Sequence, residues 1–128
     1  MTLQHIVLFS FPRELSESEY EDMRSQVARW PHEIGGFSRL RFGGDLTGAR
    51  TRGYSRLLYM EFDGVDDLRR YQQHPAHQAF HRWINERGCT PLAFDYFLDE
   101  TTMLMPESMT ESGVEESTML PGRGSATP

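Results

Sequence analysis

The chain has 128 residues and a formal net charge of -6, a length that suits a single globular domain. The charge is uneven, since residues 1–99 hold 14 acids and 12 arginines while residues 100–128 hold 5 acids and one arginine. The first segment is nearly neutral and lacks the basic field that binds a phosphate backbone, so the composition argues against a nucleic-acid partner.

Lysine is absent, and Cys89 is the only cysteine. A lysine Schiff base is therefore excluded, and with it a lysine-dependent aldolase or a pyridoxal phosphate enzyme. No intrachain disulfide can form. The apolar N-terminus lacks the basic region and cleavage site of a signal peptide, and no apolar run approaches the ~20 residues of a membrane span. We therefore expect a cytoplasmic protein without a membrane partner.

The first predicted elements are a strand and a helix. Residues 3–11 are apolar on both alternating faces, which predicts a strand covered on two sides and ended by Pro12. Ser16 and Glu19 form a capping-box signature, and apolar residues then recur at helical spacing. Pro31 is expected to kink or end this helix.

The rest of the domain continues in the same mixed pattern. The remaining predicted elements are a strand at 37–42, a strand at 54–62, a short helix capped by Asp63, a helix from about 76 to 87 and a strand at 92–98. Pro75 separates the two helices and pushes His74 toward an extended conformation, so His74 is expected to cap the break. The order β-α-β-β-α-β is that of the ferredoxin-like α+β fold.

The last segment of the chain has a different character. From residue 100 onward the periodicity vanishes, and Ser, Thr, Gly, Pro, Glu and Met dominate. We therefore divide the chain into a domain at 1–99 and a flexible tail at 100–128. Docking of the tail's methionines on a partner surface is the alternative, because methionine adapts well to interfaces.

Several short stretches occur in an order that resembles one known family. They are His5 to Phe9, Gly53-Tyr54, Phe62, Tyr71 with His74-Pro75-Ala76-His77, and Phe94-Asp95-Tyr96. Together they resemble the stress-responsive A/B-barrel domain, or Dabb, family over about residues 3–98. The resemblance implies a ferredoxin-like fold whose sheets pair across a homodimer to close a dimeric α+β barrel.

The resemblance also implies roles for individual residues. An enzymatic member of the family, a polyketide cyclase, closes a linear poly-β-ketone by intramolecular aldol condensation without a metal or an organic cofactor. Its catalytic tyrosine and histidine correspond to Tyr71 and His77, its supporting aspartate to Asp95, and a histidine of its first strand to His5. Arg56 stands where that enzyme has a further histidine, so the same substrate is not implied.

The residue types suit this chemistry. The imidazole of His77 titrates near neutral pH and can take a proton from a carbon between two carbonyls. Tyr71 would donate to the carbonyl oxygen that becomes an alkoxide, and Asp95 would orient His77. The expected substrate is a small hydrophobic, keto-bearing molecule. The expected substrate-binding residues are His5, Phe9, Tyr54, Arg56 and Leu58, with Arg56 able to receive a carboxylate or phosphate.

Each of these residues also has a structural interpretation. His77 can be a buried histidine bonded to Asp95 without a catalytic duty, and Tyr71 can be a core residue of its helix. His74, His77 and His81 have a spacing that a metal site could use. No acid at helical spacing completes such a set, so we expect no metal.

Two other functions stay open. One is a non-catalytic, stress-responsive homodimer whose barrel interior is filled by Phe9, Phe11, Leu58, Met60 and Phe94. The other is a cofactor-independent monooxygenase of the same fold. Oxygen consumption separates the monooxygenase from a cyclase, because aldol closure uses none.

Overall fold

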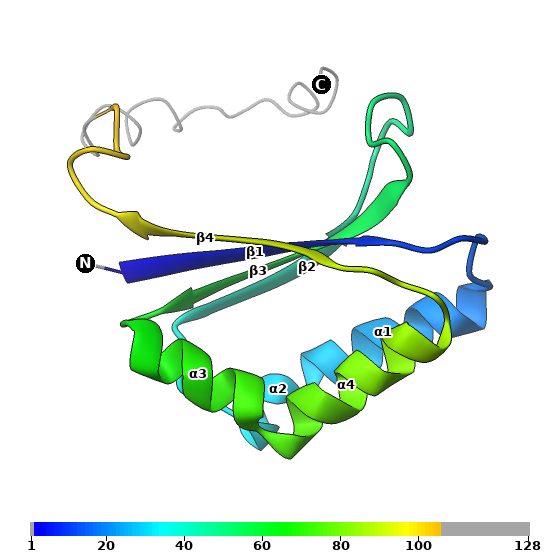
Figure 1. Ribbon diagram of the computed structural model, residues 1–128, viewed down its shortest axis with the longest axis horizontal. Helices are drawn as coiled ribbons and strands as arrows, with labels where there is room; N and C mark the ends of the chain where they lie inside the picture. The colour runs from blue at the N-terminus through cyan, green and yellow to red at the C-terminus, as the bar shows by residue number, and fades with distance from the viewer. Residues whose placement is uncertain (1, 106–128) are drawn as a thin grey trace, which may run out of the picture. The chain divides into compact units, whose positions relative to one another are not determined.

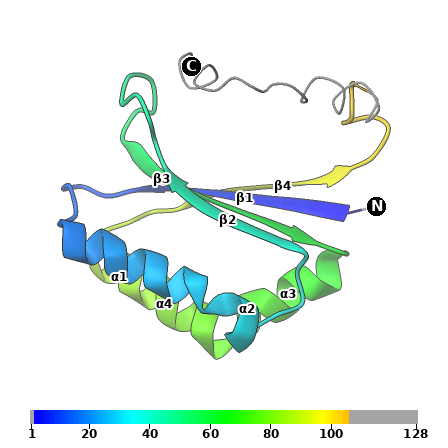
Figure 2. The same cartoon turned by 180° about the vertical axis from the view of Figure 1, so that it is seen from behind.

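The structure, a computed structural model, describes residues 2–105. The strands are β1 (Thr2–Ser10), β2 (Arg39–Gly44), β3 (Tyr54–Phe62) and β4 (Leu92–Leu98), and the helices are α1 (Glu17–Ala28), α2 (Trp30–Glu33), α3 (Val65–Gln73) and α4 (Pro75–Glu86). The strands form one sheet in the order β2-β3-β1-β4, with β3 antiparallel to both β1 and β2. All four helices cover one face of this sheet (Figures 1 and 2). The ferredoxin-like α+β fold is therefore confirmed.

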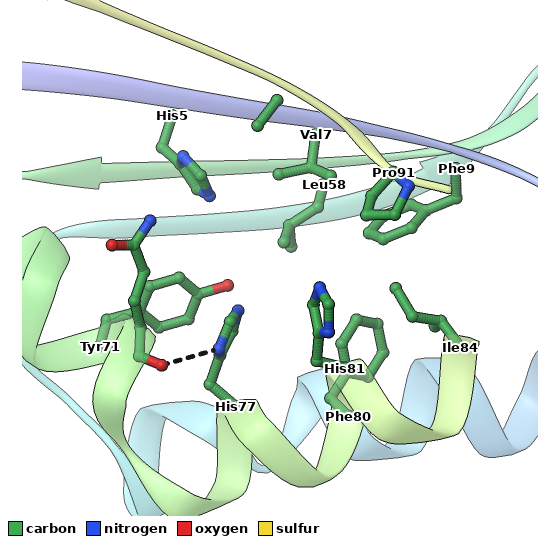
Figure 3. Close-up of a pocket in the computed structure, with 12 residues that line it drawn as sticks. His5, Val7, Phe9, Leu58, Tyr71, His77, Phe80, His81, Ile84 and Pro91 are labelled. Atoms are coloured by element: carbon green, nitrogen blue, oxygen red, sulfur yellow. Dashed lines mark hydrogen bonds between the residues drawn. The ribbon is translucent and has the colours of Figure 1, made fainter. Parts of the chain in front are cut away.

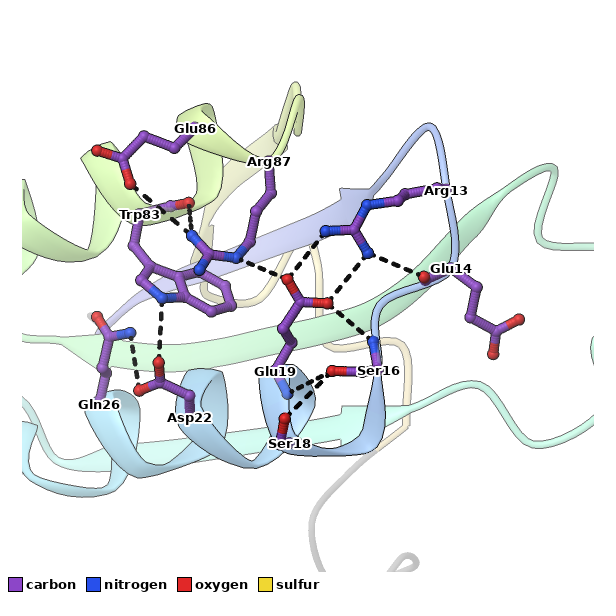
Figure 4. Close-up of polar contacts among 10 residues, drawn as sticks. All are labelled: Arg13, Glu14, Ser16, Ser18, Glu19, Asp22, Gln26, Trp83, Glu86 and Arg87. Carbon is purple, nitrogen blue, oxygen red and sulfur yellow. Dashed lines mark hydrogen bonds and ion pairs between the residues drawn. The ribbon is translucent and has the colours of Figure 1, made fainter.

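The first helix begins as its sequence predicts. Ser16 is the N-cap of α1, and both hydrogen bonds of the capping box form with Glu19. Glu19 also accepts hydrogen bonds from Arg13 and from Arg87 at the end of α4 (Figure 4). One carboxylate thus caps α1 and links it to two other segments. Pro31 lies in the first turn of α2, where its missing N–H costs nothing.

The break between α3 and α4 positions the residues that matter most for function. His74 is extended, with φ -69° and ψ 139°, because the following Pro75 disfavours a helical conformation. Its Nδ1 accepts a hydrogen bond from the backbone N–H of Ala76 at 3.0 Å, so the predicted capping role of His74 is confirmed. The prediction that Asp63 caps α3 is wrong: the N-cap is Gly64, which has no side chain to make the bond.

The core lies between the sheet and the helices. Its largest buried side chains are Trp30, Tyr71, Phe9, Phe62, Met23, Leu58 and Met60. In the register of β1 and β3, His5 faces Met60, Val7 faces Leu58 and Phe9 faces Arg56. These residues alternate along their strands, so they share the sheet face that the helices cover.

The set of residues predicted to fill the barrel interior of a non-catalytic homodimer is therefore wrong. Phe9, Leu58 and Met60 are buried under the helices and cannot fill a barrel on the other face. Phe94 alternates with Ala93 and Asp95, both directed to the helix side, and its own side chain is 64% exposed. Leu57 and Leu92 are exposed too, so the helix-free face carries apolar side chains.

The end of the chain is described only in part. The described residues up to Phe97 form one compact unit, and a second unit begins at Leu98. In this second unit Asp99 accepts hydrogen bonds from the backbone and hydroxyl of Thr101. The predicted flexibility of residues 100–128 falls mainly on residues 106–128, which lie outside the described part, and stays a prediction. Within residues 2–105, no helix is long and apolar enough to cross a membrane.

Candidate functional site

A cavity of about 150 Å³ lies between the sheet and the helices α3 and α4 (Figure 3). Its lining residues are His5, Val7, Phe9, Leu58, Tyr71, Gln72, His77, Phe80, His81, Ile84, Pro91 and Ala93. Strands β1 and β3 supply the upper wall, which includes the imidazole of His5, and helices α3 and α4 supply the other polar side chains from below. A cavity of roughly this volume accepts one benzene-sized molecule, so the space suits a ligand no larger than a single ring.

Tyr71 contributes the cavity's hydroxyl group. It lies in the last turns of α3, is 2% exposed, and packs its ring against Trp30, Phe62 and His5. Its hydroxyl has no hydrogen-bond partner within residues 2–105, and Figure 3 shows it pointing into the cavity. Burial, and secondarily the charge of Asp95, raises the pKa of Tyr71. The phenol therefore stays protonated and can donate a hydrogen bond.

His77 lies beside Tyr71, with the two ring centroids 4.5 Å apart. Its Nδ1 is 3.2 Å from the backbone carbonyl of Gln72, and a carbonyl can only accept, so Nδ1 carries the proton. The other nitrogen, Nε2, therefore holds a lone pair, and it points across the cavity (Figure 3). Burial lowers the pKa of His77 to about 4, partly opposed by the Gln72 carbonyl. The imidazole is neutral at neutral pH.

Asp95 is not the partner of His77. Its Oδ1 is 2.5 Å from Nδ1 of His5, whose side chain is almost fully buried. The expected Asp95–His77 contact is therefore wrong. Asp95 on β4 lies next to β1 in the sheet, which brings its carboxylate to His5 on the helix-covered face. The backbone carbonyl of Gln72 orients His77 in its place.

The expected substrate-binding residues divide into two groups. His5, Phe9 and Leu58 line the cavity, as predicted from the sequence. Arg56 and Tyr54 do not line it. The Arg56 guanidinium lies 3.7 Å from the ring centre of Tyr20 on α1 and donates to the carbonyl of Ser55.

The direction of the Arg56 side chain explains why it does not line the cavity. Arg56 pairs with Phe9, which does line the cavity, so its place along the strand does not exclude it. Its guanidinium lies against Tyr20 on α1, whereas the helices that line the cavity are α3 and α4. The aromatic ring of Tyr20 supplies the partner that an arginine on an apolar face requires.

Sequence analysis missed several cavity residues. Gln72, Phe80, Ile84, Pro91, Ala93 and Val7 were not among the expected site residues. His81 was considered only as a metal ligand, although its position four residues after His77 places both on one face of α4. Among residues 2–105, no group of three or more His, Cys, Asp or Glu side chains is arranged to hold a metal ion.

The fold and this cavity define a ferredoxin-like α+β domain with hydrogen-bonding and imidazole groups enclosed between its sheet and its helices. The family model of the Stress responsive A/B Barrel Domain, Dabb, matches residues 3–98. The chain belongs to this family. The resemblance inferred from the sequence is therefore confirmed.

The chain also has a curated relative, olivetolic acid cyclase from Cannabis sativa. The two are 25% identical over 97 residues, which is 75% of this chain and 96% of the relative. A solved dimeric ferredoxin-like protein of unknown function from Thermobifida fusca is 28% identical, with a TM-score of 0.67, and the match covers 77% of this chain and 92% of that one. The dimer is a property of that relative and supports the expected homodimer here.

Two more distant structures share the fold. Hydroxynitrile lyase from Passiflora edulis is 19% identical, with a TM-score of 0.69, and the match covers 82% of this chain and 97% of that one. SnoaB, a cofactor-independent oxygenase from Streptomyces nogalater, is 15% identical, with a TM-score of 0.60 and coverage of 80% and 97%. Proteins of this architecture thus include enzymes of several reaction types.

Proposed function

We propose that this domain binds a small, uncharged, keto-bearing molecule and catalyses cofactor-free acid–base chemistry on it, as a cyclase of polyketide-like β-keto compounds. One observation carries the proposal: the buried Tyr71 hydroxyl has no partner within residues 2–105 and lies beside the unprotonated Nε2 of His77. A buried hydroxyl without a hydrogen bond is costly, and a carbonyl oxygen would satisfy it. The name of the distant cyclase relative agrees with this chemistry.

The proposed steps use only these side chains. Nε2 of His77 takes a proton from the carbon between two carbonyls, while Tyr71 donates a hydrogen bond to the oxygen that becomes an enolate. The carbanion attacks a second carbonyl of the same molecule and forms the new carbon–carbon bond. The His77 imidazolium then returns its proton to the resulting alkoxide, so the protein ends unchanged.

The low pKa of His77, about 4, limits the range of substrates. A weakly basic imidazole transfers a proton efficiently only from a fairly acidic carbon. A methylene flanked by two carbonyls meets that condition much better than the carbon next to a single ketone. The buried site therefore favours β-diketones over simple ketones.

A cyclisation assay tests the proposal. Nonane-2,4,8-trione has twelve heavy atoms. Its C3, which lies between two carbonyls, attacks the C8 ketone to close a six-membered ring, and loss of one water gives a conjugated cyclohexenone, which ultraviolet absorbance follows. We expect His77→Ala to lower kcat roughly 100-fold and Tyr71→Phe roughly 10- to 100-fold, with both variants folded by circular dichroism. Unchanged rates in both variants would refute the proposed roles.

Binding without turnover is the second candidate, because the cavity is smaller than the ~300 Å³ at which ordinary ligand pockets begin. This candidate predicts saturable binding of the trione with no product. An oxygen electrode run in parallel distinguishes the monooxygenase, since only oxygenation consumes oxygen. The cyclase, the binding protein and the monooxygenase therefore differ in product formation and in oxygen consumption within one experiment.

A further inference from the structure

A third imidazole lines the same cavity, and the proposed steps leave it unused. His81 lies one helical turn after His77 on α4, with the two ring centroids 6.1 Å apart. In Figure 3 both rings project from α4 toward the strands, and the outer nitrogen of each faces the cavity. His81 is exposed whereas Tyr71 is buried, so His81 lies at the rim of the cavity and Tyr71 in its depth.

The hydrogen bond of His81 gives its ring the opposite proton arrangement from that of His77. Nδ1 of His81 is 3.2 Å from Nδ2 of Asn85, also on α4. An amide nitrogen can only donate, so Nδ1 of His81 accepts and the ring proton sits on Nε2. Two histidines on one helical face thus present different groups to the cavity: an acceptor from His77 and a donor from His81.

The cavity lining carries no formal counter-charge for an ion. The residues that line it include no arginine, aspartate or glutamate. Its donors toward a ligand include the Tyr71 hydroxyl in the depth and the His81 Nε2–H at the rim. The His77 ring contacts both neighbours, with its centroid 4.5 Å from that of Tyr71 and 6.1 Å from that of His81.

We propose that His81 is a specificity-determining residue that donates a hydrogen bond to a second oxygen of the ligand. The site then selects uncharged, ring-sized molecules with two oxygen acceptors, one for Tyr71 and one for His81, and with the intervening carbon near His77. This inference rests on the proposed function for the roles of Tyr71 and His77. It adds the requirement that the ligand carry a second oxygen, and it names His81 as the residue that binds this oxygen.

Two ligands of equal chain length test the requirement: acetylacetone, with two carbonyls, and pentan-2-one, with one. Dissociation constants come from nuclear magnetic resonance titrations of the full chain. One hydrogen bond at a partly exposed site is worth about three- to tenfold in affinity. We expect the wild type to prefer acetylacetone by such a factor, His81→Leu to remove the preference, and His81→Gln, which keeps a donor on a similar reach, to restore it.

The control is His32→Leu, because His32 is another exposed histidine, on α2, and does not line the cavity. This variant should retain the wild-type preference. The nitrogen chemical shifts of His81 give a readout independent of affinity: Nε2 should be the protonated nitrogen in the wild type. In Asn85→Leu the two nitrogens should move toward an average, and the preference for acetylacetone should fall.

The outcomes separate the two proposals. If His81→Leu keeps the preference for acetylacetone while Tyr71→Phe weakens the binding of both ligands, the role of His81 is overturned and the proposed function stands. If neither variant changes either affinity, the cavity is not the binding site and both proposals fail. A protonated Nδ1 on wild-type His81 also overturns its assignment as a donor.

Discussion

His5 on β1 and Asp95 on β4 are joined by a hydrogen bond of 2.5 Å between side chains 90 positions apart in the sequence. The bond ties the last strand of the sheet to the first, on the face that the helices cover. It also leaves His77 with a backbone carbonyl as its partner. The imidazoles of His5 and His77 are therefore oriented by different groups and can be perturbed separately.

The first prediction concerns this separation. Asp95→Asn keeps an acceptor near His5 but removes the carboxylate charge, so the ring resonances of His5 should change. The pKa of His77 should stay near 4, because burial and not Asp95 sets it. A nuclear magnetic resonance titration of the histidines checks this. If the ring resonances of His77 change more than those of His5, Asp95 supports His77 after all.

The second prediction concerns stability and pH. The pKa of His77 is about 4 in the folded chain, against roughly 6.5 when unfolded. Between these values the unfolded chain binds a proton that the folded chain does not, so stability falls as pH falls from 6.5 toward 4. After allowance for partial exposure, the loss is roughly 1 to 2 kcal/mol at pH 5.

Chemical denaturation at pH 7 and pH 5 measures this loss. His77→Gln cannot titrate, so its free energy of unfolding should fall less than that of the wild type over the same interval. Other acids contribute equally to both proteins, and the difference between them isolates His77. Equal losses would mean that His77 is not desolvated in the folded chain.

The third prediction concerns Arg56, which stacks on Tyr20 outside the cavity. Arg56→Ala should leave the affinity for acetylacetone within twofold of the wild type. It should lower the free energy of unfolding by roughly 0.5 to 1 kcal/mol, the usual strength of such a stack. A tenfold loss of affinity with an unchanged free energy of unfolding would show that Arg56 belongs to the binding site.

A pair of glycine variants tests the same packing from the other side. A Cβ at Gly44 would lie 2.6 Å from a guanidinium nitrogen of Arg56, while a Cβ at Gly43 would meet nothing within 4 Å. Gly44→Ala should therefore displace Arg56 from Tyr20 and lower the melting temperature more than Gly43→Ala does. Equal effects of the two variants would contradict the close approach of Arg56 to the backbone.

The fourth prediction concerns the helix-free face of the sheet, where Phe94 is 64% exposed and Leu92 and Leu57 are exposed too. Burying such an apolar face is favourable, and a solved relative with this fold is dimeric. Light scattering should find a dimer for the wild type and a monomer for Phe94→Glu. Val65→Glu, on α3 in the helix layer, is the control and should stay dimeric. If Phe94→Glu is still a dimer, the interface does not lie on the face of the sheet that carries Phe94.

Local sequence signals determined the elements of this protein. The capping box at Ser16, the extended residue before Pro75 and the alternation of Tyr54–Phe62 depend on neighbours a few positions away, and each reappears in the structure. The family and the ferredoxin-like order follow from the sequence of such elements. Tyr71 and His77 could be paired in advance because the family resemblance implied their roles.

Only the tertiary structure decided which distant side chains meet. The lateral order of the strands brings Asp95 to His5, and the packing of α1 on the sheet brings Tyr20 to Arg56. Neither contact is encoded in local spacing, because each depends on how separate elements pair and pack. The proton arrangements of His77 and His81 likewise follow from acceptors and donors that only the folded chain sets in place.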